Sequence, residues 1–442
     1  MNQKRSIKTI RRVAGLVVAI CLLMSVSAYG YAPQSASTEL TENASNYGEP
    51  VSTLYEDGIR QLLKGAALMA AGGGGSLELG EGMLEAFKEL NPDVEIKIDL
   101  YDVRSMSADE SSFGVAIMGS PTAHASEKDL ASVALRAYQE TLALAERYNK
   151  NAEYALALEL GGANTLVPLL CAMKYDLKVL DADMCGRAVP GLETSLSNVN
   201  GLPTSPLALT DTDGNSYDLI MADPNDAEGA ESVAVAILNH LNSNGGLTGF
   251  YYSRQDVTES IPTQSLTKCV EIGQCIEQFE AMSIEERQAK PLFDMLNEMV
   301  PGIRAVTLTP RAGSVSDFHQ EPVAGGARDG GYYYLGEKDV PGEYFFVQFN
   351  NETMAVSVLN ESGEYECLAT APCIITMYDE ITGRPLTNAD LKDGASEYKV
   401  VMGIIEVDEK WWNNPEKVSE VWTPYFKEVH YDGGVVRYKF DK

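Results

Sequence analysis

The strongest constraint on the fold is a repeated alternation between short apolar runs and segments with helical periodicity, from about residue 54 to residue 190. The apolar runs cover residues 66–70, 114–118, 154–158 and 177–180, and each is followed by a glycine-rich or acidic loop. Strands that alternate with helices predict a mostly parallel sheet with helices on both faces. Open sheets of this kind bind ligands at the carboxyl ends of their strands. We therefore expect the four loops to meet at one edge of the sheet.

The pattern of the sequence changes after Gly302. From there on, short β runs are separated by turn residues, at positions 306–308, 331–335, 343–349, 354–359, 365–370, 374–378, 399–407 and 435–440. This pattern is typical of a barrel or sandwich. We predict a three-layer α/β domain with a helical extension over residues 51–300 and a β-rich, barrel- or sandwich-like domain over residues 301–442.

The N-terminus has the order of a secretory signal peptide. Five basic residues precede an apolar run from Val13 to Val26, and Val26-Ser27-Ala28 offers a small-residue cleavage site. We expect residues 1–28 to be a signal peptide, residues 29–50 to be a disordered leader, and the protein to be periplasmic or extracellular. The alternative is an uncleaved N-terminal membrane anchor. Six cysteines remain beyond the signal, and their spacing leaves disulfide pairing open.

The charge balance limits the partners. The formal net charge is −30 at pH 7, which argues against nucleic acid and against an anionic membrane surface, because both need a cationic face. We therefore expect a small-molecule substrate or ligand and no membrane contact beyond the signal segment. The sequence leaves open whether the chain forms a homo-oligomer.

The loop Gly72-Gly73-Gly74-Gly75 can cradle an anion with its backbone N–H groups. It departs from the dinucleotide fingerprint, because Leu77 and Glu78 stand where the last glycine would be required. No Walker lysine follows it, so we expect no nucleotide cofactor. We predict that Gly73, Gly74 and Gly75 contact a ligand; the structural alternative is a tight turn that needs small residues.

Acidic residues at two strand ends are the candidate catalytic groups. Glu159 ends an apolar run and can act as a base, or it can cap local N–H groups. Asp181 and Asp183 would face the same side of an extended chain, where they could do acid–base work or hold a divalent cation. Arg187 could neutralise them, grip a substrate carboxylate, or form a structural clasp with them.

Metal binding has weaker signals. His319 is the best single histidine ligand candidate, beside Asp181 and Asp183, and no two histidines have the spacing of a zinc protease. A divalent metal is therefore possible, but the sequence does not settle its presence. No Gly-x-Ser-x-Gly elbow occurs, so a serine-hydrolase triad is not supported.

The order of these loops resembles the S-methyl thiohydantoin desulfurase family. The matching stretches are residues 72–75, 118–122 with Glu127, 159–164, 181–190, 351–352, 371–375 and 379–385. The resemblance implies an α/β domain followed by a β-rich domain. It also implies hydrolysis of a hydantoin-type or S-methyl thiohydantoin-type cyclic amide, by attack of water on a ring carbon.

The resemblance adds further residues to the expected ligand site, namely Ser120, Thr122, Gly162, Asn164, Asn351 and Glu352. The chain departs from the family pattern at Ser76, Cys185 and Cys373. Because of these departures, two alternatives stay open: a non-catalytic exported protein that binds a small molecule on the same scaffold, and a purely structural protein.

Overall fold

An eight-stranded mixed sheet organises the first part of the chain in the computed structural model, which describes residues 48–119, 125–324, 328–394 and 397–440. Its strand order is β1-β2-β5-β4-β3-β8-β6-β7. The pairs β2–β5, β5–β4 and β4–β3 are parallel, and the remaining pairs are antiparallel. The strands are β1 Ser52–Tyr55, β2 Lys97–Tyr101, β3 Ser111–Gly119, β4 Ala152–Ala157, β5 Lys178–Asp183, β6 Leu207–Asp211, β7 Ser216–Leu219 and β8 Asn244–Gly249.

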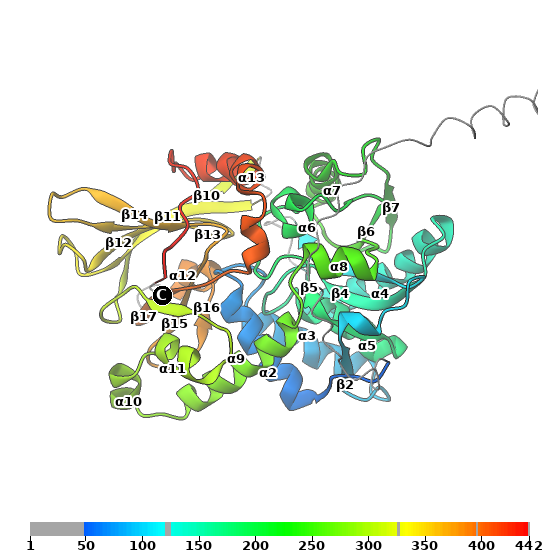
Figure 1. The fold of residues 1–442 in the computed structure, drawn as a ribbon, viewed down its shortest axis with the longest axis horizontal. Coiled ribbons are helices and arrows are strands. Elements are labelled where there is room, and N and C mark those ends of the chain that lie inside the picture. Colours follow the sequence, from blue (N-terminus) through cyan, green and yellow to red (C-terminus); the bar gives the residue numbers. More distant parts are fainter. Residues whose placement is uncertain (1–47, 120–124, 325–327, 395–396, 441–442) are drawn as a thin grey trace, which may run out of the picture. The chain divides into compact units, whose positions relative to one another are not determined.

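Helices cover this sheet, and some of them lie on the side toward the β-rich part (Figure 1). They are α2 Glu56–Met69, α3 Leu77–Leu90, α4 Glu127–Arg147, α5 Leu166–Tyr175, α6 Leu196–Val199, α7 Ala227–Leu241, α8 Arg254–Ser260, α9 Ser265–Glu280, α10 Ile284–Ala289 and α11 Leu292–Met299, with 3-10 turns at Val103–Ser105 and Leu192–Thr194. The predicted α/β architecture with its largely parallel sheet is confirmed. The strands β6, β7 and β8 were not expected, because β6 and β7 are only five and four residues long and β8 contains Gly245, Gly246 and Gly249.

The β-rich part consists of two antiparallel sheets and no closed barrel among the described residues. A five-stranded sheet has the order β10-β11-β12-β13-β14, and a four-stranded sheet has the order β16-β15-β17-β9. The strands are β9 Ala305–Thr307, β10 Val315–Val323, β11 Arg328–Gly336, β12 Tyr344–Asn350, β13 Glu352–Leu359, β14 Tyr365–Thr370, β15 Ile374–Asp379, β16 Pro385–Leu386 and β17 Val400–Ile405. The helices are α12 Asn388–Gly394 and α13 Pro415–Glu428, with a 3-10 turn at Glu409–Trp412. The prediction that this part of the chain is β-rich is confirmed.

Two local expectations were wrong. The run 66–70 is the buried end of α2 and not a strand, because α2 packs closely against α9: a Cβ at Gly65 would lie 1.9 Å from the carbonyl oxygen of Cys269. Residues 435–440 form no strand and run along the surface beside β14, where Val436 N donates to Thr370 Oγ1 at 2.8 Å.

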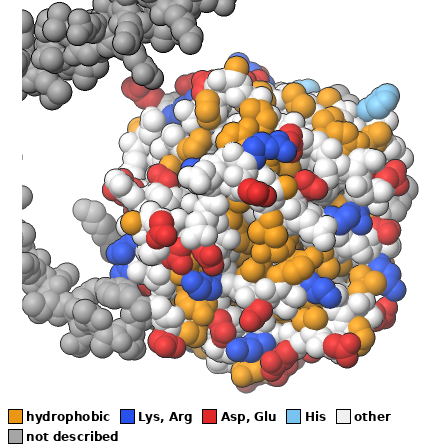
Figure 2. Space-filling view, turned by 90° about the vertical axis from the view of Figure 1, so that its right-hand side faces the viewer, with side chains coloured by type: hydrophobic (Ala, Val, Ile, Leu, Met, Phe, Trp, Pro, Cys, Tyr) orange, Lys and Arg blue, Asp and Glu red, His pale blue; other side chains and the backbone are white. Residues whose placement is uncertain are grey.

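The predicted signal peptide and most of the predicted leader lie outside the described residues. No helix among the described segments is long and apolar enough to cross a membrane. The six cysteines beyond the predicted signal are free thiols. On the face shown in Figure 2, acidic and basic side chains are interspersed around an apolar area, without a continuous basic patch.

Candidate active site

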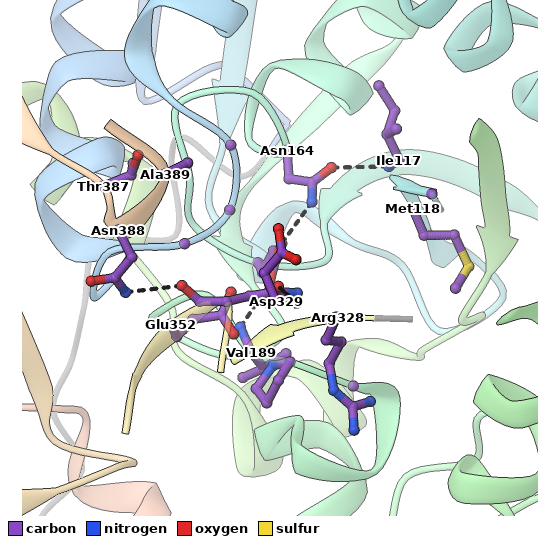
Figure 3. A pocket seen from close by; sticks show the side chains of 18 of the residues that line it. Ile117, Met118, Asn164, Val189, Arg328, Asp329, Glu352, Thr387, Asn388 and Ala389 are labelled. Carbon is purple, nitrogen blue, oxygen red and sulfur yellow. Dashed lines mark hydrogen bonds between the residues drawn. The ribbon is translucent and has the colours of Figure 1, made fainter. Parts of the chain in front are cut away.

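A cavity of about 400 Å³ lies where the α/β part meets the β-rich part (Figure 3). Ligand pockets of enzymes commonly have a volume of several hundred Å³. The α/β part contributes the loop 72–76, the end of β3, the residues after β4 and β5, and α7. The β-rich part contributes β10, β11, the turn from β12 to β13, and the start of α12. The carboxyl ends of β3, β4 and β5 therefore meet at one crevice, as expected.

The glycine loop connects two helices, α2 and α3, yet reaches the same crevice. A Cβ at Gly74 would lie 2.7 Å from the carbonyl oxygen of Leu160, and a Cβ at Gly75 would lie 2.5 Å from Cβ of Ala163. Both glycines have positive φ, +65° and +78°. Neither position accepts a larger residue without displacing the loop after β4. Gly73, Gly74 and Gly75 all line the cavity.

Glu159 lies on the cavity wall directly after β4, and its side chain is held at both oxygens. Asn164 Nδ2 donates to Oε1 at 2.6 Å, and Val189 N donates to Oε2 at 2.8 Å. Asn164 is itself fixed, because Ile117 N donates to its Oδ1 at 2.9 Å. Burial outweighs these donors and raises the pKa of Glu159 to about 7. Glu159 thus has the geometry of a fixed base whose pKa lies near neutrality.

Glu352 lies on the same cavity wall but comes from the β-rich part, at the first position of β13. It is 2% exposed, and its Oε2 has no hydrogen-bond partner among the described residues. Burial, with the nearby charge of Glu159 as the next cause, raises the pKa of Glu352 to about 8. The turn before it carries Asn351 at φ +55°, and Asn388 Nδ2 holds this turn through Asn351 O at 2.9 Å.

Arg187 lies behind these carboxyl groups and is fully buried. Its Nε donates to Ala188 O at 2.8 Å, its Nη1 donates to Cys373 O at 2.9 Å, and its guanidinium lies 5.0 Å from the ring centroid of Trp422. Burial lowers its pKa to about 10, and the charge of Glu352 is the largest opposing cause. The guanidinium forms no ion pair with Asp181 or Asp183 and does not line the cavity. Its positive charge acts to lower the pKa of Glu159 and of Glu352, although the side chain does not line the cavity.

Asp181 and Asp183 are also off the cavity wall, where each holds backbone. Asp181 accepts from Thr267 N at 2.9 Å and from Thr267 Oγ1 at 2.6 Å, which ties β5 to the first turn of α9. Asp183 accepts from Cys185 N at 2.8 Å and from Gly186 N. Burial raises the pKa of both, that of Asp183 to about 6. A direct catalytic role for either one stays a prediction.

The metal candidates do not come together. His319 lies in β10 with its side chain about half exposed, and its ring stacks on Tyr332 with 5.1 Å between centroids. It therefore lies apart from Asp181 and Asp183, which are in β5. No group of three or more potential metal-ligating side chains occurs in the described ranges. His319 and the pair Asp181 and Asp183 are therefore separate candidates, and metal binding at either place stays a prediction.

The remaining predicted ligand residues divide into three groups. Asn164, Asn351 and Glu352 line the cavity. Gly162 does not, because it packs behind the glycine loop and donates to Gly75 O at 3.1 Å. Ser120 and Thr122 lie outside the described residues.

A second polar group on the cavity wall was missed by the sequence analysis. Arg328 forms an ion pair with Glu428 at 2.8 Å and lies 4.4 Å from the ring centroid of Tyr425, whose hydroxyl donates to Glu193. Glu231 lies beside Arg328. Burial, and next the charge of Glu193, raise the pKa of Glu231 to about 7. These residues come from β11, α7, α13 and the turn at 192–194, so no local motif marks them.

The comparisons with known proteins agree with this architecture. A solved structure of a protein from Chromobacterium violaceum matches with a TM-score of 0.70 at 20% identity, over 87% of this chain and 99% of that chain, which shows a shared fold. No curated protein matches the chain. The S-Me-THD-like N-terminal domain matches residues 57–220, and the S-Me-THD-like C-terminal domain matches residues 224–431. Because these two matches cover most of the chain, it belongs to the S-Me-THD-like family, the S-methyl thiohydantoin desulfurase family that its loops indicate.

Proposed function

We propose that this protein hydrolyses a five-membered cyclic amide of the S-methyl thiohydantoin or hydantoin type. The observation that carries the proposal is the pair Glu159 and Glu352. They come from different parts of the chain, lie on one cavity wall and are both almost fully buried. Their pKa values of about 7 and about 8 favour one ionised and one protonated carboxyl group near neutral pH. This is the state needed for simultaneous base and acid catalysis.

In the first half of the reaction, water attacks the ring carbon that bears the sulfur. The Glu159 carboxylate takes a proton from the water as the new C–O bond forms. The electron pair of the ring C=N bond moves to nitrogen, and that nitrogen receives the proton of Glu352. The ring carbon then carries a hydroxyl group and the S-methyl group.

In the second half, the C–S bond breaks and its electron pair leaves with sulfur. Glu159 returns its proton to the sulfur, which leaves as methanethiol. The hydroxyl group on the ring carbon gives its proton to the Glu352 carboxylate as the C=O bond forms. Both carboxyl groups return to their starting states, and the net reaction consumes one water.

The test is turnover by the purified protein, measured as thiol release from an S-methyl thiohydantoin and as ring opening of a hydantoin. Replacing Glu159 by Gln keeps the size of the side chain and removes the base. We expect kcat to fall about 100- to 10,000-fold, the usual contribution of a positioned acid or base. Glu89→Gln is the matched control, because it removes the same charge from a side chain that is 73% exposed on α3.

No turnover by the unchanged protein on any ring of this class would reject hydrolysis. Full activity in Glu159→Gln would reject Glu159 as the base. If the unchanged protein binds rings of this class but turns over neither the S-methyl thiohydantoin nor the hydantoin, the alternative function applies, which is a non-catalytic binder of small cyclic amides. The departures from the family pattern at Ser76, Cys185 and Cys373 are the observation that favours this alternative.

Export is a separate proposal, supported by the basic residues, apolar run and cleavage site at the N-terminus. Cell fractionation of the full chain, with a chain lacking residues 1–28 as the control, tests it. Export predicts that only the full chain leaves the cytoplasm and loses its N-terminal segment. An intact chain retained in the membrane would instead show the anchor alternative.

A further inference from the structure

Two backbone N–H groups of the glycine loop have no partner among the described residues. Gly75 and Ser76 line the cavity, and their N–H groups donate to no atom in the part of the chain that the structure describes. The preceding carbonyl groups explain this. Gly74 O accepts from Asn164 N at 3.1 Å, and Gly75 O accepts from Gly162 N at 3.1 Å, so both carbonyls point toward the loop after β4.

The peptide geometry then sets the direction of the N–H groups. The peptide bonds Gly74–Gly75 and Gly75–Ser76 are trans, because the cis bonds within the described residues are Ser205-Pro206 and Ala371-Pro372. In a planar trans peptide, the C=O and N–H groups point in opposite directions. The N–H groups of Gly75 and Ser76 therefore point away from the loop after β4. A polar group on a cavity wall that lacks a protein partner is available to a ligand or water.

These two N–H groups also lie at the N-terminus of a helix. Ser76 is the N-cap of α3, a helix of 14 residues, and its Oγ accepts from Leu79 N at 3.2 Å. The side chain of Ser76 thus closes the helix while its own N–H stays free. The N-terminus of a helix carries a partial positive charge that favours negative charge on a ligand.

A second observation points to a ligand beside this loop. Glu352 is 2% exposed, lines the cavity, and has an Oε2 without a partner among the described residues. Its Oε1 lies against Gly73, at 1.9 Å from where a Cβ would be. A buried carboxyl oxygen without a partner is costly unless a bound molecule or water satisfies it. The Glu352 carboxyl group thus lies against the glycine loop that carries the two N–H groups, and all three line the same cavity.

We propose that the N–H groups of Gly75 and Ser76 bind the ring carbonyl oxygen that neighbours the nitrogen protonated by Glu352. This inference rests on the proposed function and deepens it. Attack at the carbon that bears sulfur sends an electron pair to the ring nitrogen, and conjugation spreads that negative charge onto the adjacent carbonyl oxygen. Two fixed N–H groups at that oxygen stabilise the charge as it develops. The site then selects rings in which a carbonyl group is conjugated with the reacting carbon.

A pair of variants at position 76 tests the N–H group itself. Ser76 has φ −68°, the value that proline imposes, so Ser76→Pro removes the N–H with little change in backbone direction. Ser76→Ala removes the same hydroxyl group and keeps the N–H, which makes it the matched reference. We expect kcat of Ser76→Pro to lie about 100-fold below that of Ser76→Ala, as for the loss of one oxyanion donor. Equal kcat values in the two variants would overturn the proposal.

Two neutral ring probes give a binding readout that does not depend on turnover. Hydantoin carries the carbonyl group in question, and imidazolidin-2-one is the same ring without it. We expect Ser76→Pro to bind hydantoin about tenfold more weakly than Ser76→Ala does, and both variants to bind imidazolidin-2-one equally. Weakening of both probes by the same factor would show a general disturbance of the cavity and would contradict the proposal.

A crystal structure of the unchanged protein with hydantoin decides the matter if Ser76→Pro does not fold. We expect a ring carbonyl oxygen at about 2.7–3.1 Å from both backbone nitrogens. Turnover with that oxygen placed elsewhere overturns this inference and leaves the proposed hydrolysis standing. Absence of turnover with the oxygen at both nitrogens rejects the hydrolysis and leaves the carbonyl site standing.

Discussion

The carboxyl group of Glu352 lies directly against the backbone of Gly73, so closely that a Cβ on Gly73 would be 1.9 Å from Oε1. Gly73 belongs to the connection between α2 and α3, and Glu352 begins β13. Two backbone hydrogen bonds flank this contact: Thr353 N donates to Ala71 O at 2.8 Å, and Asn388 N donates to Gly72 O at 2.9 Å. The proposed acid is therefore positioned by the other part of the protein.

Gly73→Ala is expected to damage the site more than the fold. The new methyl group must displace the carboxyl group of Glu352, because both cannot occupy the same space. We expect a loss of about 1–3 kcal/mol in the free energy of unfolding, typical of overpacking, and a fall in kcat like that of Glu352→Gln. Urea unfolding and thiol release measure the two effects. Gly434→Ala is the control, since no atom lies within 4 Å of a Cβ there. Unchanged kcat in Gly73→Ala would contradict the contact.

The pH dependence of turnover should be bell-shaped. Activity requires Glu159 ionised, which is favoured above about pH 7, and Glu352 protonated, which is favoured below about pH 8. The two apparent values belong to the pair, because each charge affects the other. Glu352→Gln cannot lose a proton, so we expect its residual kcat/KM to keep the acid limb and lose the fall at high pH. A profile of Glu352→Gln that still falls above pH 8 would assign that limb to another group.

The sequence predicts those parts of the fold and the site that depend on local chemistry. Alternating apolar runs gave the parallel strands β3, β4 and β5, and the loops after them meet at the cavity as expected. The run 66–70 was misread because a short apolar segment fits a buried strand and a buried helix end equally well. What decides it is α9, nearly 200 residues later, which buries that end of α2.

The roles of the site residues depend on long-range packing in the same way. Nothing near Glu352 in the sequence shows that it shares a cavity with Glu159, because the two come together only when β13 packs on the glycine loop. Asp181 and Asp183 carry a conspicuous local pattern, yet α9 and the loop after β5 occupy their oxygens. Arg328 and Glu231 have no local pattern at all and still line the cavity.

Stability should fall as pH rises through the neutral range. Burial raises the folded-state pKa of Glu159 to about 7, of Glu231 to about 7 and of Glu352 to about 8, whereas these groups titrate near 4.5 in an unfolded chain. Between those limits the folded state binds more protons than the unfolded state. The free energy of unfolding is therefore highest below about pH 4.5 with respect to these groups, and it decreases up to about pH 8.

Urea unfolding at pH 5.5 and pH 8.0 measures this decrease. Glu352→Gln removes one of the three groups, so its free energy of unfolding should decrease less between the two pH values. Glu89→Gln, at an exposed position, should decrease as much as the unchanged protein does. An equal or steeper decrease in Glu352→Gln would show that Glu352 is ionised in the folded protein at both pH values.

Asp181→Asn separates a structural role from a catalytic one. Thr267 donates to both oxygens of Asp181, from its N–H and from its hydroxyl group, and an amide side chain can accept only one of these bonds well. We expect a loss of about 1–3 kcal/mol in the free energy of unfolding, since a buried partner is left unpaired. Thr267→Val removes the hydroxyl donor from the same contact, so the losses in the two variants should not add. Since the Asp181 side chain lies off the cavity wall, kcat per folded molecule should fall far less in Asp181→Asn than in Glu159→Gln. A fall in kcat as large as that of Glu159→Gln, with stability intact, would give Asp181 the direct catalytic role that its position in the sequence predicts.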